Sequence, residues 1–150
     1  MSLNSFIFRK MCIKSDSARD SGLTTPEDIE RFDNILYGDN KKWNLLDVYR
    51  PKSATDNKLP VIVSFHGGGW VYGSKEVYQF YCMELAKRGF AVINYTYRLA
   101  PKYKYPAPFE DTNNVFAWLM KNADRYGFDT DNIFAVGDSA GATGISLYVC

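Results

Sequence analysis

The residues best suited to chemistry in this sequence surround Ser139. This serine lies at the centre of Gly137-Asp138-Ser139-Ala140-Gly141, which follows the apolar run 133–136 and precedes a series of small residues. A Gly-x-Ser-x-Gly segment between a strand and a helix forms a sharp turn that exposes the serine hydroxyl, where it acts as a nucleophile. Because the motif fixes only three positions, it indicates such a site only together with a second element.

That second element is a glycine loop at His66-Gly67-Gly68-Gly69, which also follows an apolar run, residues 60–65. Glycines lack a Cβ, so their amides approach a ligand closely and reach unusual φ values at little cost. When a hydroxyl attacks a carbonyl carbon, the carbonyl oxygen becomes negative, and one amide donor stabilises this transition state by roughly 3 kcal/mol. We predict an oxyanion hole at Gly67, Gly68, Gly69 and Ala140, in which Gly67 shapes the turn and the other three donate.

His66 permits two interpretations, a catalytic base or a support of the glycine loop. We favour the support, because His66 lies on the very loop whose amides would bind the oxyanion. It is the single histidine of the chain, and no cysteine or carboxylate cluster accompanies it. We therefore predict neither a metal site nor a cofactor.

For the neighbours of these motifs, structural roles compete with functional ones. We expect Asp138 to point away from the serine on the tight turn, and Arg98 to hold its own loop through an ion pair. Trp70 and Tyr72 would either line a substrate pocket or pack in the core. The sequence leaves these two alternatives open.

The elements that must position these residues alternate between strand and helix signals. Such alternation predicts an α/β fold with a mostly parallel central sheet flanked by helices. Residues 1–22 are polar and mixed, and we expect a loosely ordered arm or part of a lid. We expect strands at residues 43–49, 60–65, 90–95 and 133–136, and helices at residues 26–37, 75–88, 108–126 and 142–150.

Three motifs in the same order, His66 to Trp70, Tyr97 to Pro101 and Gly137 to Gly141, resemble the hormone-sensitive-lipase family of esterases, especially its bacterial acetyl-esterases and lipases. The resemblance implies the α/β-hydrolase fold, Ser139 as nucleophile, and an oxyanion hole at Gly68, Gly69 and Ala140. It also implies that the Tyr97–Pro101 loop supports the site. Residues 1–42 would form an N-terminal arm and part of a cap, and residues 43–150 the first half of the catalytic domain.

The other two members of a catalytic triad are missing after the serine. In this fold the acid and then the histidine follow the serine along the chain, but residues 140–150 contain neither. We therefore expect the acid and the base downstream of residue 150, in a chain truncated after the helix behind the turn. Residues 1–150 alone should be inactive, because removal of a triad member costs several orders of magnitude in rate.

Composition limits the partners and the cellular location that we expect for this protein. The 150 residues carry a net charge of +1, which provides no argument for binding to nucleic acid. No apolar run reaches the length of a membrane span, and the start lacks the apolar core of a signal peptide. Cys12, Cys82 and Cys150 have no metal or redox spacing. We predict a cytoplasmic protein whose partner is a small-molecule ester, and we leave a homo-oligomer open.

Three other functions compete with a serine carboxylesterase or lipase for short-chain acyl esters. The segment His66-Gly67-Gly68-x-Trp70 also resembles the loop of kynurenine formamidase, so an arylformamidase or amidase is one alternative. A non-catalytic binder is the second, because the gibberellin receptors resemble the same family and keep the serine without the histidine. An inert fragment with exposed sheet edges is the third.

Overall fold

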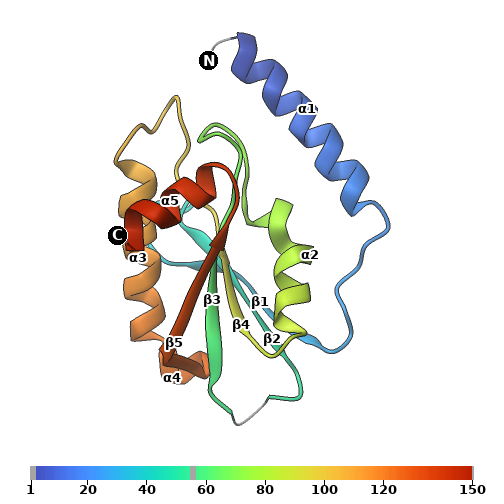
Figure 1. Cartoon of the computed structure of the whole chain (residues 1–150), viewed down its shortest axis with the longest axis vertical. Coiled ribbons are helices and arrows are strands. Elements are labelled where there is room, and N and C mark those ends of the chain that lie inside the picture. The colour runs from blue at the N-terminus through green and yellow to red at the C-terminus, as the bar shows by residue number, and fades with distance from the viewer. Residues whose placement is uncertain (1–2, 55–56, 150) are drawn as a thin grey trace.

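The computed structural model describes residues 3–54 and 57–149, which form a five-stranded sheet with helices on both faces (Figure 1). The strand order is β1-β2-β4-β3-β5, in which β3, β4 and β5 are parallel and β1 and β2 are antiparallel to their neighbours. The predicted fold class, a mostly parallel sheet between helices, is confirmed. The strands are β1 (Ile29–Leu36), β2 (Leu45–Pro51), β3 (Leu59–Phe65), β4 (Ala91–Tyr95) and β5 (Phe128–Gly137). The helices are α1 (Leu3–Asp20), α2 (Lys75–Ala86), α3 (Ala107–Lys121), α4 (Ala123–Tyr126) and α5 (Ala140–Val149).

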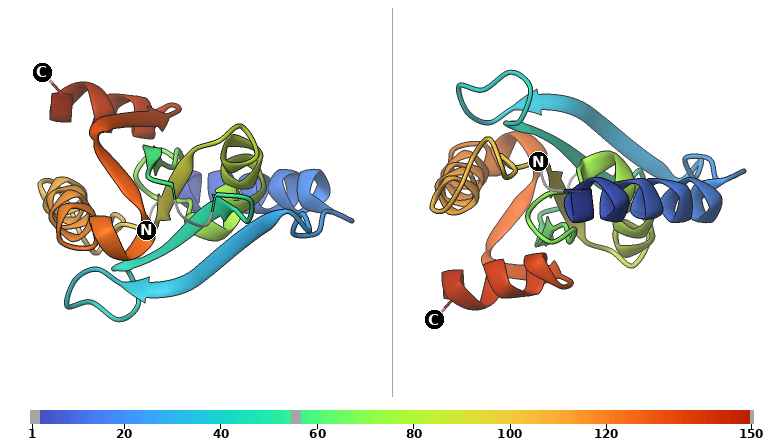
Figure 2. Two further views of the ribbon diagram at one scale, coloured as in Figure 1. Left: turned by 90° about the horizontal axis from the view of Figure 1, so that it is seen from below. Right: turned by 90° about the horizontal axis from the view of Figure 1, so that it is seen from above.

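The sheet has an apolar cluster on each face, because its central strands are apolar on both sides. Consecutive residues of β3, such as Val61 and Ile62, are buried in different clusters. One cluster includes Val115 of α3 and is joined by Ile145 of α5, whereas the other includes Met83 of α2. Figure 2 shows α2 and α3 on opposite sides of the sheet. Because β3 and β5 are parallel, their carboxyl ends lie at the same edge of the sheet, where the predicted motifs follow.

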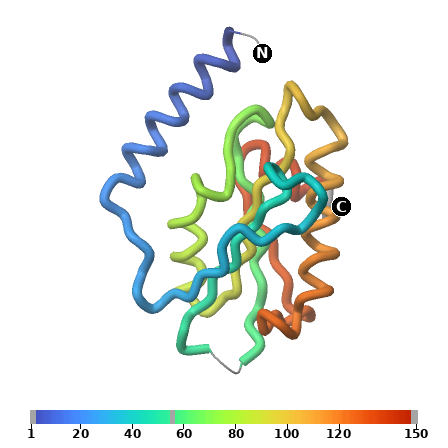
Figure 3. Tube along the Cα trace, turned by 180° about the vertical axis from the view of Figure 1, so that it is seen from behind, coloured from blue at the N-terminus to red at the C-terminus, as the bar shows by residue number. Residues whose placement is uncertain are grey.

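The predicted helix over residues 26–37 is wrong, because Ile29–Leu36 form strand β1 at one edge of the sheet (Figure 3). The apolar residues Ile29, Phe32 and Ile35 are spaced by three, which is typical of a helix. In the structure Ile29 belongs to the apolar cluster on one face of the sheet, whereas Phe32 and Ile35 pack against the cluster on the other face. A register shift between Phe32 and Ile35 brings these two onto the same face. Asn34 has a positive φ of 57° there, and its amide donates to Oδ1 of Asp47 at 2.7 Å. The helical period therefore arises from one change of face and one bulge.

The predicted loose arm over residues 1–22 is also wrong, since Leu3–Asp20 form helix α1. Figures 1 and 2 show α1 running along the outside of the molecule. It contacts the loop before α2 and the first turn of α2 through two hydrogen bonds. Tyr72 donates to Oδ2 of Asp16 at 2.7 Å, and the Arg19 guanidinium donates to the carbonyl of Val77 at 2.6 Å. The arm is thus an ordered helix above the predicted site.

The remaining elements agree with the sequence, with shifts at their ends. The strands expected at residues 60–65 and 90–95 and the helix expected at residues 75–88 are confirmed. The strand expected at 43–49 lies two residues later, and the helix expected at 108–126 is interrupted at Asn122. β5 begins at Phe128, before its expected start, and the last residue of the expected final helix, Cys150, lies outside the described residues.

Candidate active site

Ser139 lies at the tip of the turn between β5 and α5. Its φ is +50°, a conformation that residues other than glycine rarely adopt and that persists only where the surroundings hold it. The two flanking glycines allow the turn to sit directly on the end of β3. A Cβ at Gly137 would lie 2.7 Å from the carbonyl oxygen of Phe65, and one at Gly141 would overlap with the same oxygen. The motif glycines are therefore required by backbone packing.

The glycine loop follows β3 and presents unpaired amides beside this turn. Gly68 and Gly69 have φ values of +118° and +58°, and a Cβ at Gly68 would overlap with the carbonyl of Tyr72. Within the described part of the chain, no group accepts a hydrogen bond from the amide of Gly68, Gly69 or Ala140. The amide of Gly67, by contrast, donates to the Tyr78 hydroxyl at 3.2 Å. Three of the four residues predicted to form an oxyanion hole thus retain a free donor, whereas the amide of Gly67 is paired.

His66 is fixed beneath the glycine loop. The side chain is completely buried and stacks on the Tyr97 ring, with ring centroids 4.0 Å apart and planes inclined by 9°. Its Nδ1 lies 2.7 Å from the carbonyl oxygen of Gly67, so the proton of the neutral ring belongs on Nδ1. Burial lowers the pKa of His66 to about 4, so the ring is neutral at pH 7. These contacts suit a support of the loop better than a mobile base.

Tyr78 on α2 connects the glycine loop to the serine turn, a link that the sequence did not reveal. Its hydroxyl accepts from the Gly67 amide and donates to Oδ1 of Asp138 at 2.6 Å. Burial, followed by the hydrogen bond to Asp138, raises the pKa of Tyr78, so the phenol keeps its proton and can donate. Asp138 therefore has a structural partner, in agreement with the structural role expected for it.

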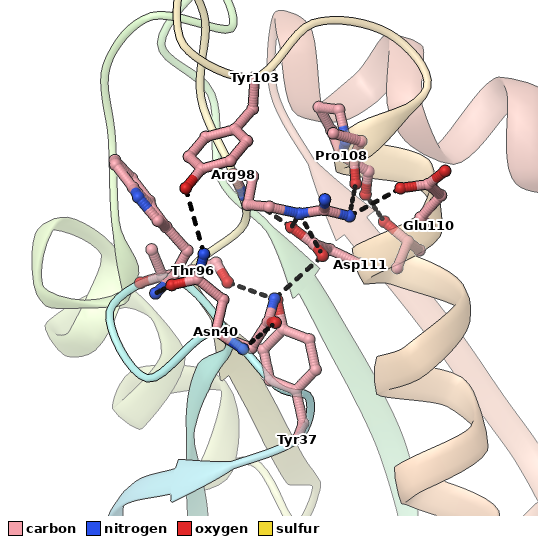
Figure 4. Close-up of polar contacts among 12 residues, drawn as sticks. Tyr37, Asn40, Thr96, Arg98, Tyr103, Pro108, Glu110 and Asp111 are labelled. Carbon is pink, nitrogen blue, oxygen red and sulfur yellow. Dashed lines mark hydrogen bonds and ion pairs between the residues drawn. The ribbon is translucent and has the colours of Figure 1, made fainter.

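Arg98 holds the Tyr97–Pro101 loop against α3, as predicted. Its Nε lies 2.9 Å from Oδ1 of Asp111, and its Nη2 lies 2.8 Å from Oε2 of Glu110 (Figure 4). Asp111 is buried and also accepts from the Arg98 amide at 2.7 Å and from Nδ2 of Asn44 at 2.9 Å. The neighbouring Tyr97 hydroxyl donates to the carbonyl of His66 at 2.8 Å. The loop thereby braces the end of β3, which is the supporting role expected from the resemblance.

Two pockets flank the glycine loop. The first, of about 230 Å³, contains Ser139 and Gly68, and Tyr72 lines its wall. Helix α1 covers it with Phe8, Cys12, Ser15 and Asp16. The second, of about 380 Å³, is lined mainly by apolar and aromatic side chains, among them Trp70, Phe109 and Leu147. Trp70 and Tyr72 therefore both line pockets, and Trp70 also packs against the apolar core.

The described residues contain no group of three or more histidine, cysteine or acidic side chains that could hold a metal ion. None of the helices described is long and apolar enough to cross a bilayer.

Comparisons with known proteins bear on the family and the fold of this chain. Residues 46–148 match the model of the BD-FAE family. Esterase LipC of Mycobacterium tuberculosis is 35% identical over 71% of this chain and 27% of its own length. Arylacetamide deacetylase of Bos taurus is 38% identical over 63% of this chain and 25% of its own length. Among solved structures, esterase B from Lactobacillus rhamnosis superposes with a TM-score of 0.90 and 30% identity over 96% of this chain.

The chain spans about a quarter of the length of these curated relatives and 47% of the esterase B chain. The family match covers more than half of the chain, and the solved structures share its sheet and helices. The chain therefore belongs to the BD-FAE family, among the α/β-hydrolase esterases that are related to hormone-sensitive lipase.

Proposed function

We propose that this chain carries the nucleophile and the oxyanion hole of a serine carboxylesterase or lipase that acts on short-chain acyl esters. One observation supports this most directly. Ser139 is exposed at the tip of a turn with positive φ, beside the unpaired amides of Gly68, Gly69 and Ala140. A nucleophile next to preorganised donors is the arrangement that acyl transfer requires.

In the proposed reaction Ser139 Oγ attacks the ester carbonyl carbon while a base takes the hydroxyl proton. The carbonyl oxygen becomes negative and accepts hydrogen bonds from the amides of Gly68, Gly69 and Ala140. The bond to the alcohol then breaks, and the departing oxygen takes the proton from the base. Water attacks the resulting acyl-serine in the same way, which releases the acid and restores the serine.

We propose that the acid and the base come from a segment after residue 150. Residues 140–150 contain no histidine and no acidic residue, and buried His66 is occupied with the loop. The relatives are longer than this chain, so they have room for both groups. We also propose that residues 1–42 form part of a cap, since α1 covers the pocket that contains Ser139.

Two observations support short acyl chains. The pocket that contains Ser139 has a volume of only about 230 Å³. Esterase B from Lactobacillus rhamnosis, which shares the fold, was solved as a complex with a tributyrin phosphonate. A small-molecule ester as partner, a cytoplasmic location and a homo-oligomer belong to the same proposal.

The test is the intact mass of the natural polypeptide that contains this sequence, before and after reaction with a fluorophosphonate probe. We expect one adduct that is absent in Ser139→Ala, together with hydrolysis of p-nitrophenyl acetate. The 150-residue chain should react far more slowly, because it lacks the base. An adduct that persists in Ser139→Ala would contradict the assignment of the nucleophile. Faster cleavage of an anilide than of the matching ester would favour the amidase, and binding without cleavage would favour the non-catalytic binder.

A further inference from the structure

Helix α1 turns its apolar side away from the protein. Leu3, Phe6, Ile7, Met11 and Ile13 are between 44% and 72% exposed. Ser5, Arg9, Cys12 and Asp16 lie on the opposite side of the helix and are less exposed. A surface helix normally shows the reverse arrangement, with its apolar side toward the core. The outer side of α1 is therefore a surface that suits a partner.

The charges along this helix narrow the chemistry of that partner. Between Leu3 and Lys14 the helix contains three basic residues and no acidic residue. Lys10 and Lys14 are exposed along the same outer side, and the Lys10 ammonium lies 4.8 Å from the centroid of the Phe6 ring. The net charge of +1 for the whole chain conceals this local excess. We call the set Leu3, Phe6, Ile7, Lys10, Met11, Ile13 and Lys14 the outer face of α1.

We infer that the outer face of α1 docks on a lipid surface that contains anionic headgroups. Apolar side chains flanked by lysines, on a helix too polar to cross a bilayer, are typical of helices that lie in the membrane interface. The apolar side chains would enter the boundary between headgroups and acyl chains, while Lys10 and Lys14 would contact the headgroups.

A second copy of the chain fits this face less well. In a twofold contact the same surface meets itself, so Lys10 and Lys14 would approach their own copies. The outer face has no carboxylate that could pair with them. Like charges brought together at an interface oppose association, whereas anionic lipid neutralises them.

Docking in this orientation has a consequence for the candidate site. The inner side of α1 covers the pocket that contains Ser139. The lipid surface would then lie about one helix diameter, roughly 10 Å, from that pocket. The inference does not depend on the esterase proposal, because it rests on the outer side of α1 alone.

The test is co-sedimentation of the natural polypeptide that contains this sequence with vesicles. One set contains phosphatidylcholine alone, and the other contains three parts phosphatidylcholine to one part phosphatidylglycerol. We expect binding to the second set that weakens in about 0.5 M salt, where the attraction is screened. Lys10→Glu/Lys14→Glu and Ile7→Ser/Met11→Ser should each weaken binding by about tenfold or more.

Matched controls place the same changes elsewhere on exposed positions. Lys41→Glu/Lys52→Glu alters the charge equally, and Leu36→Ser/Met120→Ser removes two exposed apolar side chains. Both controls should bind like the unmodified chain. As a second measurement, Phe6→Trp should give a blue-shifted difference emission on the anionic vesicles. No binding, equal binding to both vesicle types, or equal losses in the controls would overturn the inference. So would a dimer that Ile7→Ser/Met11→Ser disrupts in the absence of lipid binding.

Discussion

The glycine loop and the serine turn lie side by side, yet the protein holds them in different ways. Side chains hold the loop: His66 is completely buried, stacks on Tyr97 and binds the Gly67 carbonyl. The turn is held by close backbone packing, because Gly137 and Gly141 have no side chain and lie directly against the carbonyl of Phe65. Loss of a polar contact has a graded cost, whereas an added atom in a backbone contact has no room. Loss of a side chain that supports the loop should therefore cost less stability than a Cβ added at Gly141. Gly68 of the loop, whose Cβ would overlap with the Tyr72 carbonyl, should tolerate a Cβ no better than Gly141 does.

The sharpest test of this contrast is Gly141→Ala, for which we expect the largest effect. The added methyl group would overlap with the Phe65 carbonyl, and neither backbone can move without displacing β3 or α5. The free energy of unfolding should fall by about 3 kcal/mol or more, as measured by urea denaturation. Labelling of Ser139 in the natural polypeptide should also be lost. Ala142→Ser adds one atom on the exposed side of α5 and should change little; an equal effect of both variants would contradict the steric origin of the loss.

Among the side chains that support the glycine loop through the Tyr97–Pro101 loop, we expect the largest loss of stability on removal of the buried carboxylate of Asp111. This carboxylate accepts from the Arg98 amide, the Arg98 guanidinium and Asn44, so its removal leaves several donors without a partner. Asp111→Ala should lower the free energy of unfolding by about 3 kcal/mol. The exposed partner Glu110 provides the control, since Glu110→Ala should cost less than about 1 kcal/mol. Similar losses in both variants would show that burial of the pair is unimportant.

The pH dependence of stability tests whether His66 is as firmly held as the structure indicates. Burial lowers the pKa of His66 to about 4, whereas the unfolded chain has the ordinary value near 6.5. Between these pH values only the unfolded state binds the proton, so the free energy of unfolding falls as pH decreases through this window. The slope should approach about 1.4 kcal/mol per pH unit, with a total of about 3 kcal/mol.

Because the chain contains a single histidine, no other imidazole contributes to this pH dependence. His66→Asn should remove the component of the pH dependence between about pH 6.5 and 5, where few carboxylates titrate. The same pH dependence in both proteins would mean that the ring titrates normally in the folded state.

The smallest effect is expected for Tyr78→Phe, which removes the hydroxyl between Gly67 and Asp138. Asp138 is exposed and water can replace the lost contact, so stability should fall by only about 1 kcal/mol. Labelling of Ser139 should slow severalfold, because the loop and the turn lose their direct link. Tyr81→Phe, on the same helix and 47% exposed, should behave like the unmodified protein. A loss of labelling as severe as in Gly141→Ala would remove the distinction between the two regions.

The sequence predicted the centre of the molecule well for a physical reason. Strand β3 is buried on both faces, and an almost continuous apolar run of this length, bounded by polar residues and glycines, is typical of such a strand. Glycine and serine in fixed spacing likewise report a backbone requirement, which the positive φ of Ser139 and the tight contact of Gly141 now explain. Local sequence was sufficient to predict these elements because the conformation of the neighbouring backbone determines which residues can occupy them.

The sequence failed where distant residues set the constraint. The bulge near Asn34 depends on Asp47 of the next strand, so its effect on the apolar spacing of β1 has no local signal. The role of Tyr78 depends on contacts with Gly67 and Asp138, from two other parts of the chain. The sequence around Tyr78 contains no pattern that indicates this role.

The position of β5 at the end of the sheet has a consequence for how the protein folds. Val61 of β3 pairs with Ala91 of β4 but also with Ile133 of β5, which closes a loop more than twice as long. Longer loops cost more entropy to close, so pairings between distant residues form slowly. The β3–α2–β4 unit should therefore assemble first, and β5 should join it late. The strand that leads into the Ser139 turn would then be among the last of the described elements to fold.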